Sequence, residues 1–117
     1  MPDIPQVKAL SAALSGGEPL VTTGVILQEL LQGFSGPKQS DDLIERFTAI
    51  AMISPTRNDH IAAAALRNLC RRSGVQVGTI DAIIAQLCIR NDLELLTTDQ
   101  DFLGIAKYSK LKVWNND

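Results

Sequence analysis

Three aspartates, one at the start of an apolar helix and two after an apolar strand, are the residues best suited to chemistry. The segment Thr79-Ile80-Asp81-Ala82-Ile83-Ile84-Ala85 places Asp81 near the start of an apolar helix, and Asp99 and Asp101 follow an apolar strand expected over residues 93–96. In a parallel α/β layer, strand ends and helix starts at one edge of the sheet lie close together, so these acids can converge there. A carboxylate cluster at such an edge is what a hard divalent cation requires.

Each of these acids also has a structural interpretation. Asp81 lies in the first turn of its helix, where the helix dipole favours a negative charge. Thr79 is the expected cap of that helix, which leaves Asp81 to face the sheet edge. Asp99 is nearer the strand end and is assigned to the metal, whereas Asp101 is assigned to capping the next helix or to an outer position of the site.

Glu29 is a further candidate, because it lies in an apolar helical stretch on the same face as Val25. A carboxylate in such surroundings is costly to bury unless it is paired or coordinates an ion. A solvated glutamate on a helix edge is the alternative.

The remaining polar candidates are weaker. His60 is expected on the surface, in the first turn of a helix. Arg67 and Arg71 are spaced i, i+4 and are followed by Arg72, which fits either a path for a polyanion or a solvated helix face. The chain has no glycine-rich phosphate loop, and no Ser-His-Asp set can be assembled from it.

Length and composition predict a single globular domain spanning residues 1–117. Hydrophobic residues make up 45% of the chain and charged residues 21%, as in soluble proteins. Aromatic residues at 4% argue against stacking platforms for nucleic acid, and a net charge of −2 argues against a broad basic surface. Cys70 and Cys88 are expected as buried free thiols. With no signal peptide or long apolar run, the protein is expected to be soluble and cytoplasmic.

Helices and short apolar strands alternate along the chain, which predicts an α/β fold with a mainly parallel sheet. The expected strands cover residues 20–23, 93–96 and 111–114, and brief extended segments are expected at residues 52–53 and at Val75 and Val77. The expected helices cover residues 5–14, 25–32, a segment capped by Ser40 or Asp41, a segment capped by Asn58 or Asp59 and ending at Gly74, the segment after Thr79, and 102–107. The expected core faces of the two middle helices are Leu43, Ile44 and Phe47, and Ile61, Ala62, Ala65, Leu66 and Leu69.

Three segments in this order resemble a PIN domain, most closely the VapC type, the ribonuclease toxin of bacterial and archaeal toxin–antitoxin pairs. The segments are Val21-Thr22-Thr23-Gly24-Val25-Ile26-Leu27-Gln28-Glu29-Leu30-Leu31-Gln32-Gly33, the Asp81 segment quoted above, and Leu95-Leu96-Thr97-Thr98-Asp99-Gln100-Asp101-Phe102. The resemblance runs from about Val7 to the end of the chain. It implies a three-layer α/β/α domain with a mainly parallel central sheet.

The resemblance also implies roles for individual residues. Glu29, Asp81 and Asp99 match the acids that hold Mg²⁺ or Mn²⁺ and carry catalysis. Asp101 matches a position that sometimes assists at the metal, and Thr97 one that places a hydroxyl at the site. In the family this cluster activates water to cut an RNA phosphodiester, since the metal neutralises the scissile phosphate and lowers the pKa of the attacking water.

The chain departs from the family at its start. Members begin with an apolar strand that ends in an aspartate, whereas this chain begins Met1-Pro2-Asp3-Ile4-Pro5. Asp3 is not preceded by a strand and is not assigned to the metal. We therefore expect an N-terminally short PIN domain that lacks this strand, through either a start at an internal methionine or true shortening.

Two alternative functions remain open at this point. A truncated PIN-like module could bind an antitoxin or RNA without cutting, and a flavodoxin-like receiver or phosphatase domain is a more remote option. The partners implied by the resemblance are a VapB-type antitoxin that covers an apolar groove, a second copy of the chain in a homodimer, and an RNA substrate. No membrane is expected among the partners, and nothing identifies the RNA.

Overall fold

The chain folds as two compact units, Met1–Ser54 and Pro55–Asp117. The computed structural model describes residues 21–33, 36–97 and 100–113. The helix expected over residues 5–14 and the candidate ligand Asp99 lie outside the described residues.

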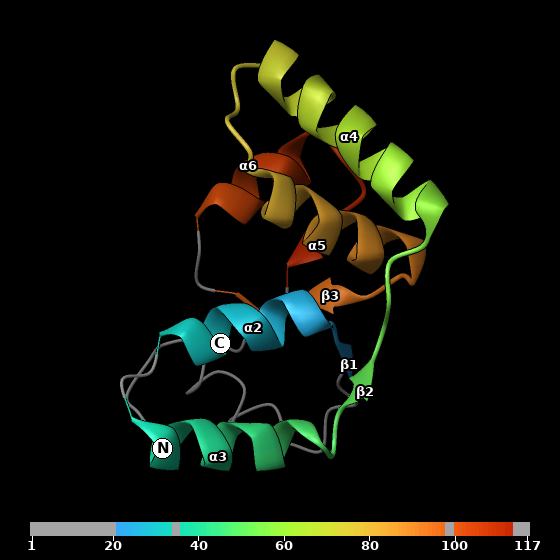
Figure 1. The fold of residues 1–117 in the computed structure, drawn as a ribbon. Helices are drawn as coiled ribbons and strands as arrows, with labels where there is room; N and C mark the ends of the chain where they lie inside the picture. Colours follow the sequence, from blue (N-terminus) through green and yellow to red (C-terminus); the bar gives the residue numbers. More distant parts are fainter. Residues whose placement is uncertain (1–20, 34–35, 98–99, 114–117) are drawn as a thin grey trace. The chain divides into compact units, whose positions relative to one another are not determined.

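The first unit is a parallel strand pair joined by helices (Figure 1). Its elements are β1 (Val21–Thr22), α2 (Gly24–Gln32), α3 (Pro37–Phe47) and β2 (Ala51–Met52). Val21 lies opposite Ala51 and Thr22 opposite Met52. Parallel strands need a long crossover connection, and α2 and α3, which contact each other, supply it. The strand expected over residues 20–23 is confirmed in its described part, as are the helix over 25–32 and an extended segment at Met52.

Helix α3 begins earlier than the sequence predicted. Its N-cap is Gly36, not Ser40 or Asp41, and Pro37 occupies its first turn. Proline suits this position because its fixed φ is already helical and its missing N–H would have no partner there. Leu43 and Phe47 are buried as expected, but Ile44 is 44% exposed and does not belong to the core.

The second unit contains the remaining helices and a second parallel strand pair. Its elements are α4 (Arg57–Arg72), α5 (Thr79–Arg90), β3 (Glu94–Leu95), α6 (Asp101–Lys107) and β4 (Lys112–Val113). Glu94 pairs with Lys112 and Leu95 with Val113. The described residues therefore confirm the α/β class and the parallel pairing of its strands.

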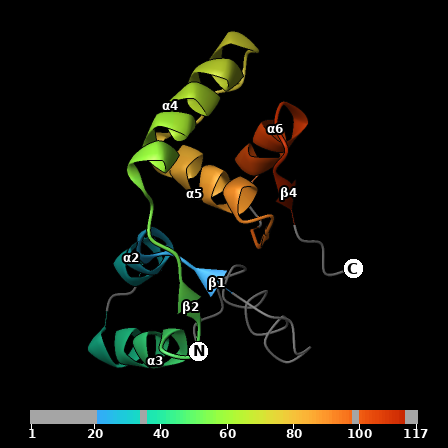
Figure 2. The same ribbon diagram turned by 90° about the vertical axis from the view of Figure 1, so that its right-hand side faces the viewer.

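Helix α5 is the most buried element of this unit. Its buried residues are Ala82, Ile83, Ile84, Ala85 and Leu87. A helix that is apolar on most sides must be covered on most sides. Figure 2 shows α5 between α4 and α6, and both helices contact it.

The start of α4 is set by a capping box. Thr56 is the N-cap: its Oγ1 accepts a hydrogen bond from the Asp59 backbone N–H at 3.2 Å, and Asp59 Oδ2 accepts one from the Thr56 N–H at 2.9 Å. The predicted caps Asn58 and Asp59 were therefore wrong, because both are helical residues. The predicted end at Gly74 is confirmed, since Gly74 has a φ of +84° that other residues rarely adopt.

The buried face of α4 also differs from the prediction. Ile61 is 62% exposed and Leu69 is 39% exposed, whereas Asp59, Ala63 and Cys70 are buried. The three buried residues share one face of the helix. Of the other predicted core residues, Ala62 and Leu66 are half-buried and Ala65 is exposed. The ion pair between Asp59 and Arg90 of α5, at 2.7 Å, compensates the polar residue on the buried face.

Both cysteines are free thiols, as expected; Cys70 is buried and Cys88 half-buried. Burial raises the pKa of both, that of Cys88 to about 11. Both thiols therefore stay protonated near neutral pH and are poor nucleophiles. Within the described part of the chain, no helix is long and apolar enough to cross a membrane.

Candidate nuclease site

Asp81 lies in the first turn of α5, as the sequence predicted, and is half-buried. The cap of this helix is Gly78 and not Thr79, which is the first helical residue. Gly78 has an extended backbone, and its carbonyl accepts a hydrogen bond from the Ala82 N–H at 3.0 Å, so the helix begins one residue earlier than expected. The helix dipole at this end favours the ionised carboxylate of Asp81.

The connection between β3 and α6 carries the other candidates of the second unit. Thr97 is half-buried just after β3, and Asp101 is exposed as the first residue of α6. The predicted capping role of Asp101 was wrong, because Gln100 is the N-cap. Asp99 belongs to this connection by sequence and lies outside the described residues.

Glu29 lies on α2 in the first unit and is exposed, whereas Val25 on the same face is half-buried. Exposure removes the argument that this carboxylate must be compensated by a buried partner. Glu29 and Asp81 belong to different units, and each is described within its own unit. Among the described residues, which do not include Asp99, no three His, Cys, Asp or Glu side chains lie close enough to hold a metal ion.

The chemistry of the candidate donors nevertheless suits a hard cation. Glu29, Asp81, Asp99 and Asp101 offer carboxylate oxygens, and Thr97 offers a hydroxyl. Mg²⁺ and Mn²⁺ prefer oxygen ligands of this kind. The donor set therefore fits a divalent ion by ligand type.

Asp59 is the most buried charged residue among the described ones, and sequence reasoning treated it only as a helix cap. Its Oδ1 accepts hydrogen bonds from Arg90 Nε at 2.7 Å and Gln86 Nε2 at 3.4 Å. Burial by itself raises the pKa of Asp59, but these bonds and those from the Thr56 N–H and hydroxyl outweigh it and lower the pKa to about 2. The Thr56-Arg57-Asn58-Asp59 spacing was the available sequence signal.

The arginines of α4 differ in their environments. Arg67 is half-buried, and its Nε donates a hydrogen bond to the Val77 carbonyl at 2.8 Å. Arg71 is exposed and donates to Asn68 Oδ1 at 3.2 Å, and Arg72 is exposed as well. Arg71 and Arg72 are exposed, which fits both interpretations of this group, whereas Arg67 is tied to the loop before α5.

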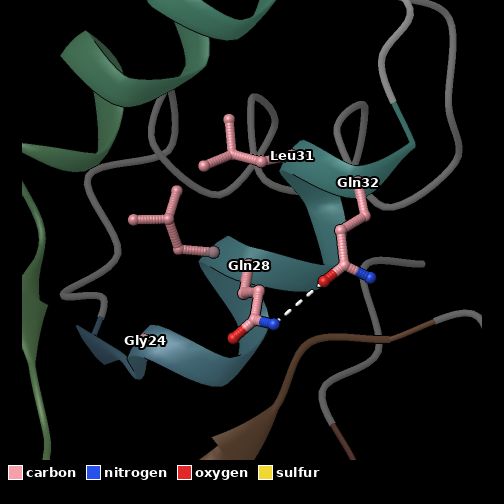
Figure 3. Close-up of a pocket in the computed structure, with 5 residues that line it drawn as sticks. Gly24, Gln28, Leu31 and Gln32 are labelled. Atoms are coloured by element: carbon pink, nitrogen blue, oxygen red, sulfur yellow. Dashed lines mark hydrogen bonds between the residues drawn. The ribbon is translucent and has the colours of Figure 1, made fainter.

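One face of α2 carries an open hollow of about 330 Å³ (Figure 3). It is lined by Gly24, Leu27, Gln28, Leu31 and Gln32. Gln28 Nε2 donates a hydrogen bond to Gln32 Oε1 at 2.9 Å, one turn along the helix. The two leucines give the hollow an apolar floor, and the two amides give it a polar border.

The short parallel strands and the acids at helix starts are features of a nuclease-like α/β domain. The family model of the PIN domain matches residues 3–108, and the chain therefore belongs to the PIN domain family. PIN domains are generally nucleases and typically use divalent metal ions. The matched range includes Glu29, Asp81, Asp99 and Asp101. No curated protein matches the chain.

Proposed function

We propose that this protein is a metal-dependent endoribonuclease of the VapC toxin type, which hydrolyses phosphodiester bonds in RNA. The observation that carries the proposal is the position of Asp81, half-buried in the first turn of α5, within a chain that matches the PIN domain over residues 3–108. The acids at the start of α6 belong to the same matched region.

In this proposal Glu29, Asp81 and Asp99 hold Mg²⁺ or Mn²⁺, and Asp101 and Thr97 assist. The bound ion supplies neutralisation of the scissile phosphate and acidification of the attacking water. Asp81 lies in the first turn of α5, where the helix dipole favours a negative charge. The Thr97 hydroxyl can both donate and accept a hydrogen bond, which suits it to orienting water.

Cleavage of labelled single-stranded RNA in the presence of Mg²⁺ tests the proposal. We expect Asp81→Asn and Asp99→Asn each to abolish cleavage, because the amide is a neutral and poorer ligand. Asp42→Asn is the matched control, since Asp42 is exposed on α3, and it should leave cleavage unchanged. Chelation should stop the reaction and added Mg²⁺ should restore it. Cleavage retained by both site variants would rule out the proposed site.

The second candidate function is a PIN-like module that engages a VapB-type antitoxin or RNA without cutting. The open hollow on α2 offers two leucines to a partner and would supply the binding surface that this candidate needs. Titration of the protein with Mn²⁺ by calorimetry separates the two functions. Binding supports the nuclease, and undetectable binding at millimolar Mn²⁺ supports the module.

The partners and location follow from the same proposal. A VapB-type antitoxin should be encoded by a small gene beside this one and should co-purify with the protein when both are expressed. Leu31→Glu, which places a charge in the α2 hollow, should weaken that complex, and Gln32→Glu at its border should weaken it less. We also propose a homodimer, which light scattering would report as about twice 12.7 kDa, and a cytoplasmic location.

A further inference from the structure

The loop between α4 and α5 is held at its end by a side chain of the preceding helix. Arg67 is half-buried on α4, and its Nε lies 2.8 Å from the Val77 carbonyl oxygen, to which it donates a hydrogen bond. The Val77 side chain is itself buried, with 7% of its surface exposed. Arg67 therefore fixes the peptide immediately before the Gly78 cap.

This tether replaces a side-chain cap at the start of α5. Gly78 has no side chain that could accept a hydrogen bond from the first turn, and no side-chain cap bond is formed at this end. A glycine before a helix leaves the entering backbone with unusual freedom. The direction of the first turn, which carries Asp81, thus depends on what holds the Val77–Gly78 peptide.

The beginning of the same loop is held separately. The Val75 N–H donates to the Cys70 carbonyl at 2.8 Å, which closes the end of α4. Gly104 of α6 lies close to Val75, since a Cβ at position 104 would come within 3.0 Å of the Val75 Cγ1. At the other end of the loop, Arg67 binds the Val77 carbonyl.

We infer that Arg67 is a positioning residue for the nuclease site: through the Val77 carbonyl it sets where the first turn of α5 presents Asp81. The inference rests on the proposed function. Groups that orient metal ligands from behind typically change metal affinity or activity by about 10–100-fold when they are removed. A small displacement of a reacting group has a similar effect on rate.

Two substitutions isolate the hydrogen bond. Arg67→Met keeps an apolar stem but has no donor, whereas Arg67→Lys keeps a donor and the charge. We expect Arg67→Met to weaken Mn²⁺ binding to the RNA-free protein and to lower kcat, each by about 10-fold or more, with KM within twofold. In Arg67→Lys, Mn²⁺ affinity and kcat should both remain close to the wild-type values. The control is Arg71→Met, one turn further along the exposed face of α4, which should change neither.

The outcomes separate this role from a direct contact with RNA. If Arg67 bound phosphate, Arg67→Met would raise KM, leave kcat and Mn²⁺ affinity unchanged, and reduce the salt dependence of RNA binding, and that result would overturn the inference. Wild-type values for Arg67→Met in both assays would overturn it as well. Should Arg67→Met fail to fold, Arg67→Leu, which also has an apolar stem and no donor, takes its place and should fall below Arg67→Lys. A wild-type protein that neither binds Mn²⁺ nor cuts RNA would reject the proposed function together with this role. An active wild type whose Arg67 variants lack the expected changes would reject only this role.

Discussion

At the scale of single residues, the most consequential side chain of the second unit is Asp59. It ties the first turn of α4 to the last turn of α5 through Arg90, and it completes the capping box with Thr56. A buried carboxylate is tolerated only when its hydrogen-bonding capacity is used, and Asp59 accepts bonds from three different residues. Its charge therefore contributes to stability and to the choice of the α4 face that packs on α5.

Removing this charge should destabilise the protein. Asp59→Asn keeps the shape but loses the ionic hydrogen bond to Arg90, and we expect the free energy of unfolding at pH 7 to fall by about 2 kcal/mol. Urea denaturation measures this loss. The control is Asp92→Asn, which removes an exposed ion pair with Lys112 and should leave the free energy of unfolding nearly unchanged, because solvent screens exposed pairs. Equal losses in the two variants would contradict the structural role of Asp59.

The low pKa of Asp59 also predicts how stability depends on pH. The folded-state pKa of about 2 lies below the ordinary value of 3.8, so the unfolded chain binds a proton at this residue more readily than the folded protein. The stabilisation of about 2 kcal/mol is thus fully present above pH 4–5 and is lost as the pH falls through 3.8 toward 2. Urea denaturation from pH 7 to pH 2 should show the difference between the wild type and Asp59→Asn shrinking over that range. A difference that stayed constant would contradict the assignment.

At the scale of elements, α5 is the helix around which the second unit is built. Both α4 and α6 contact it, and the loop before it is held by Arg67 and by the contact between Val75 and Gly104. Because a glycine in a helix has no Cβ, Gly104 allows α6 to approach Val75 closely. The approach of α6 to this loop is therefore a matter of steric fit.

Gly104→Ala tests this fit. Alanine favours a helix over glycine by about 1 kcal/mol, but the added Cβ would lie 3.0 Å from the Val75 Cγ1. We expect the clash to outweigh the gain, with a net loss of about 1 kcal/mol in the free energy of unfolding. In a Val75→Ala background the same substitution should become stabilising. A double-mutant cycle by urea denaturation gives the sign of the interaction free energy between the two substitutions. Additive effects would show that the two side chains do not clash.

At the scale of the whole molecule, the proposed ligands come from segments far apart in the chain. Helices α3 and α4 separate Glu29 from Asp81 in the sequence, and Asp99 follows strand β3. Long-range sets of this kind act only in the folded protein, so a bound ion stabilises the fold. Metal binding and thermal stability should therefore be linked.

Mn²⁺ should raise the melting temperature of the wild-type protein. At about 100-fold above its Kd, the ion adds about 2.7 kcal/mol to the free energy of unfolding. Asp81→Asn should lose this shift, and Asp42→Asn, on the surface of α3, should keep it. Differential scanning calorimetry with and without Mn²⁺ measures the effect. An equal shift in Asp81→Asn would remove Asp81 from the proposed ligand set.

The sequence by itself determined the family, the α/β class, most element positions and the presence of Asp81 in a first helical turn. These properties are local, because periodicity and turn residues act over a few positions and short motifs retain their order. Helix caps were less well predicted: Gly36, Thr56 and Gly78 each precede the residues expected, since several neighbouring residues can cap a helix and only the backbone selects one.

The tertiary structure alone decided which face of α4 is buried and what Arg67 does. Apolar spacing favoured Ile61 and Leu69, but the buried face carries Ala63 and Cys70 together with Asp59, which is paired with Arg90 of α5. Likewise, i, i+4 spacing could not show that Arg67 reaches the Val77 carbonyl whereas Arg71 stays on the surface. Both outcomes depend on contacts between residues that are separated in the sequence. Such contacts form only once the chain has folded, so a local sequence pattern does not reveal them. The position of Asp81 in the first turn of its helix follows from the local sequence pattern. The hydrogen bond from Arg67 to the Val77 carbonyl, just before that helix, depends on the fold.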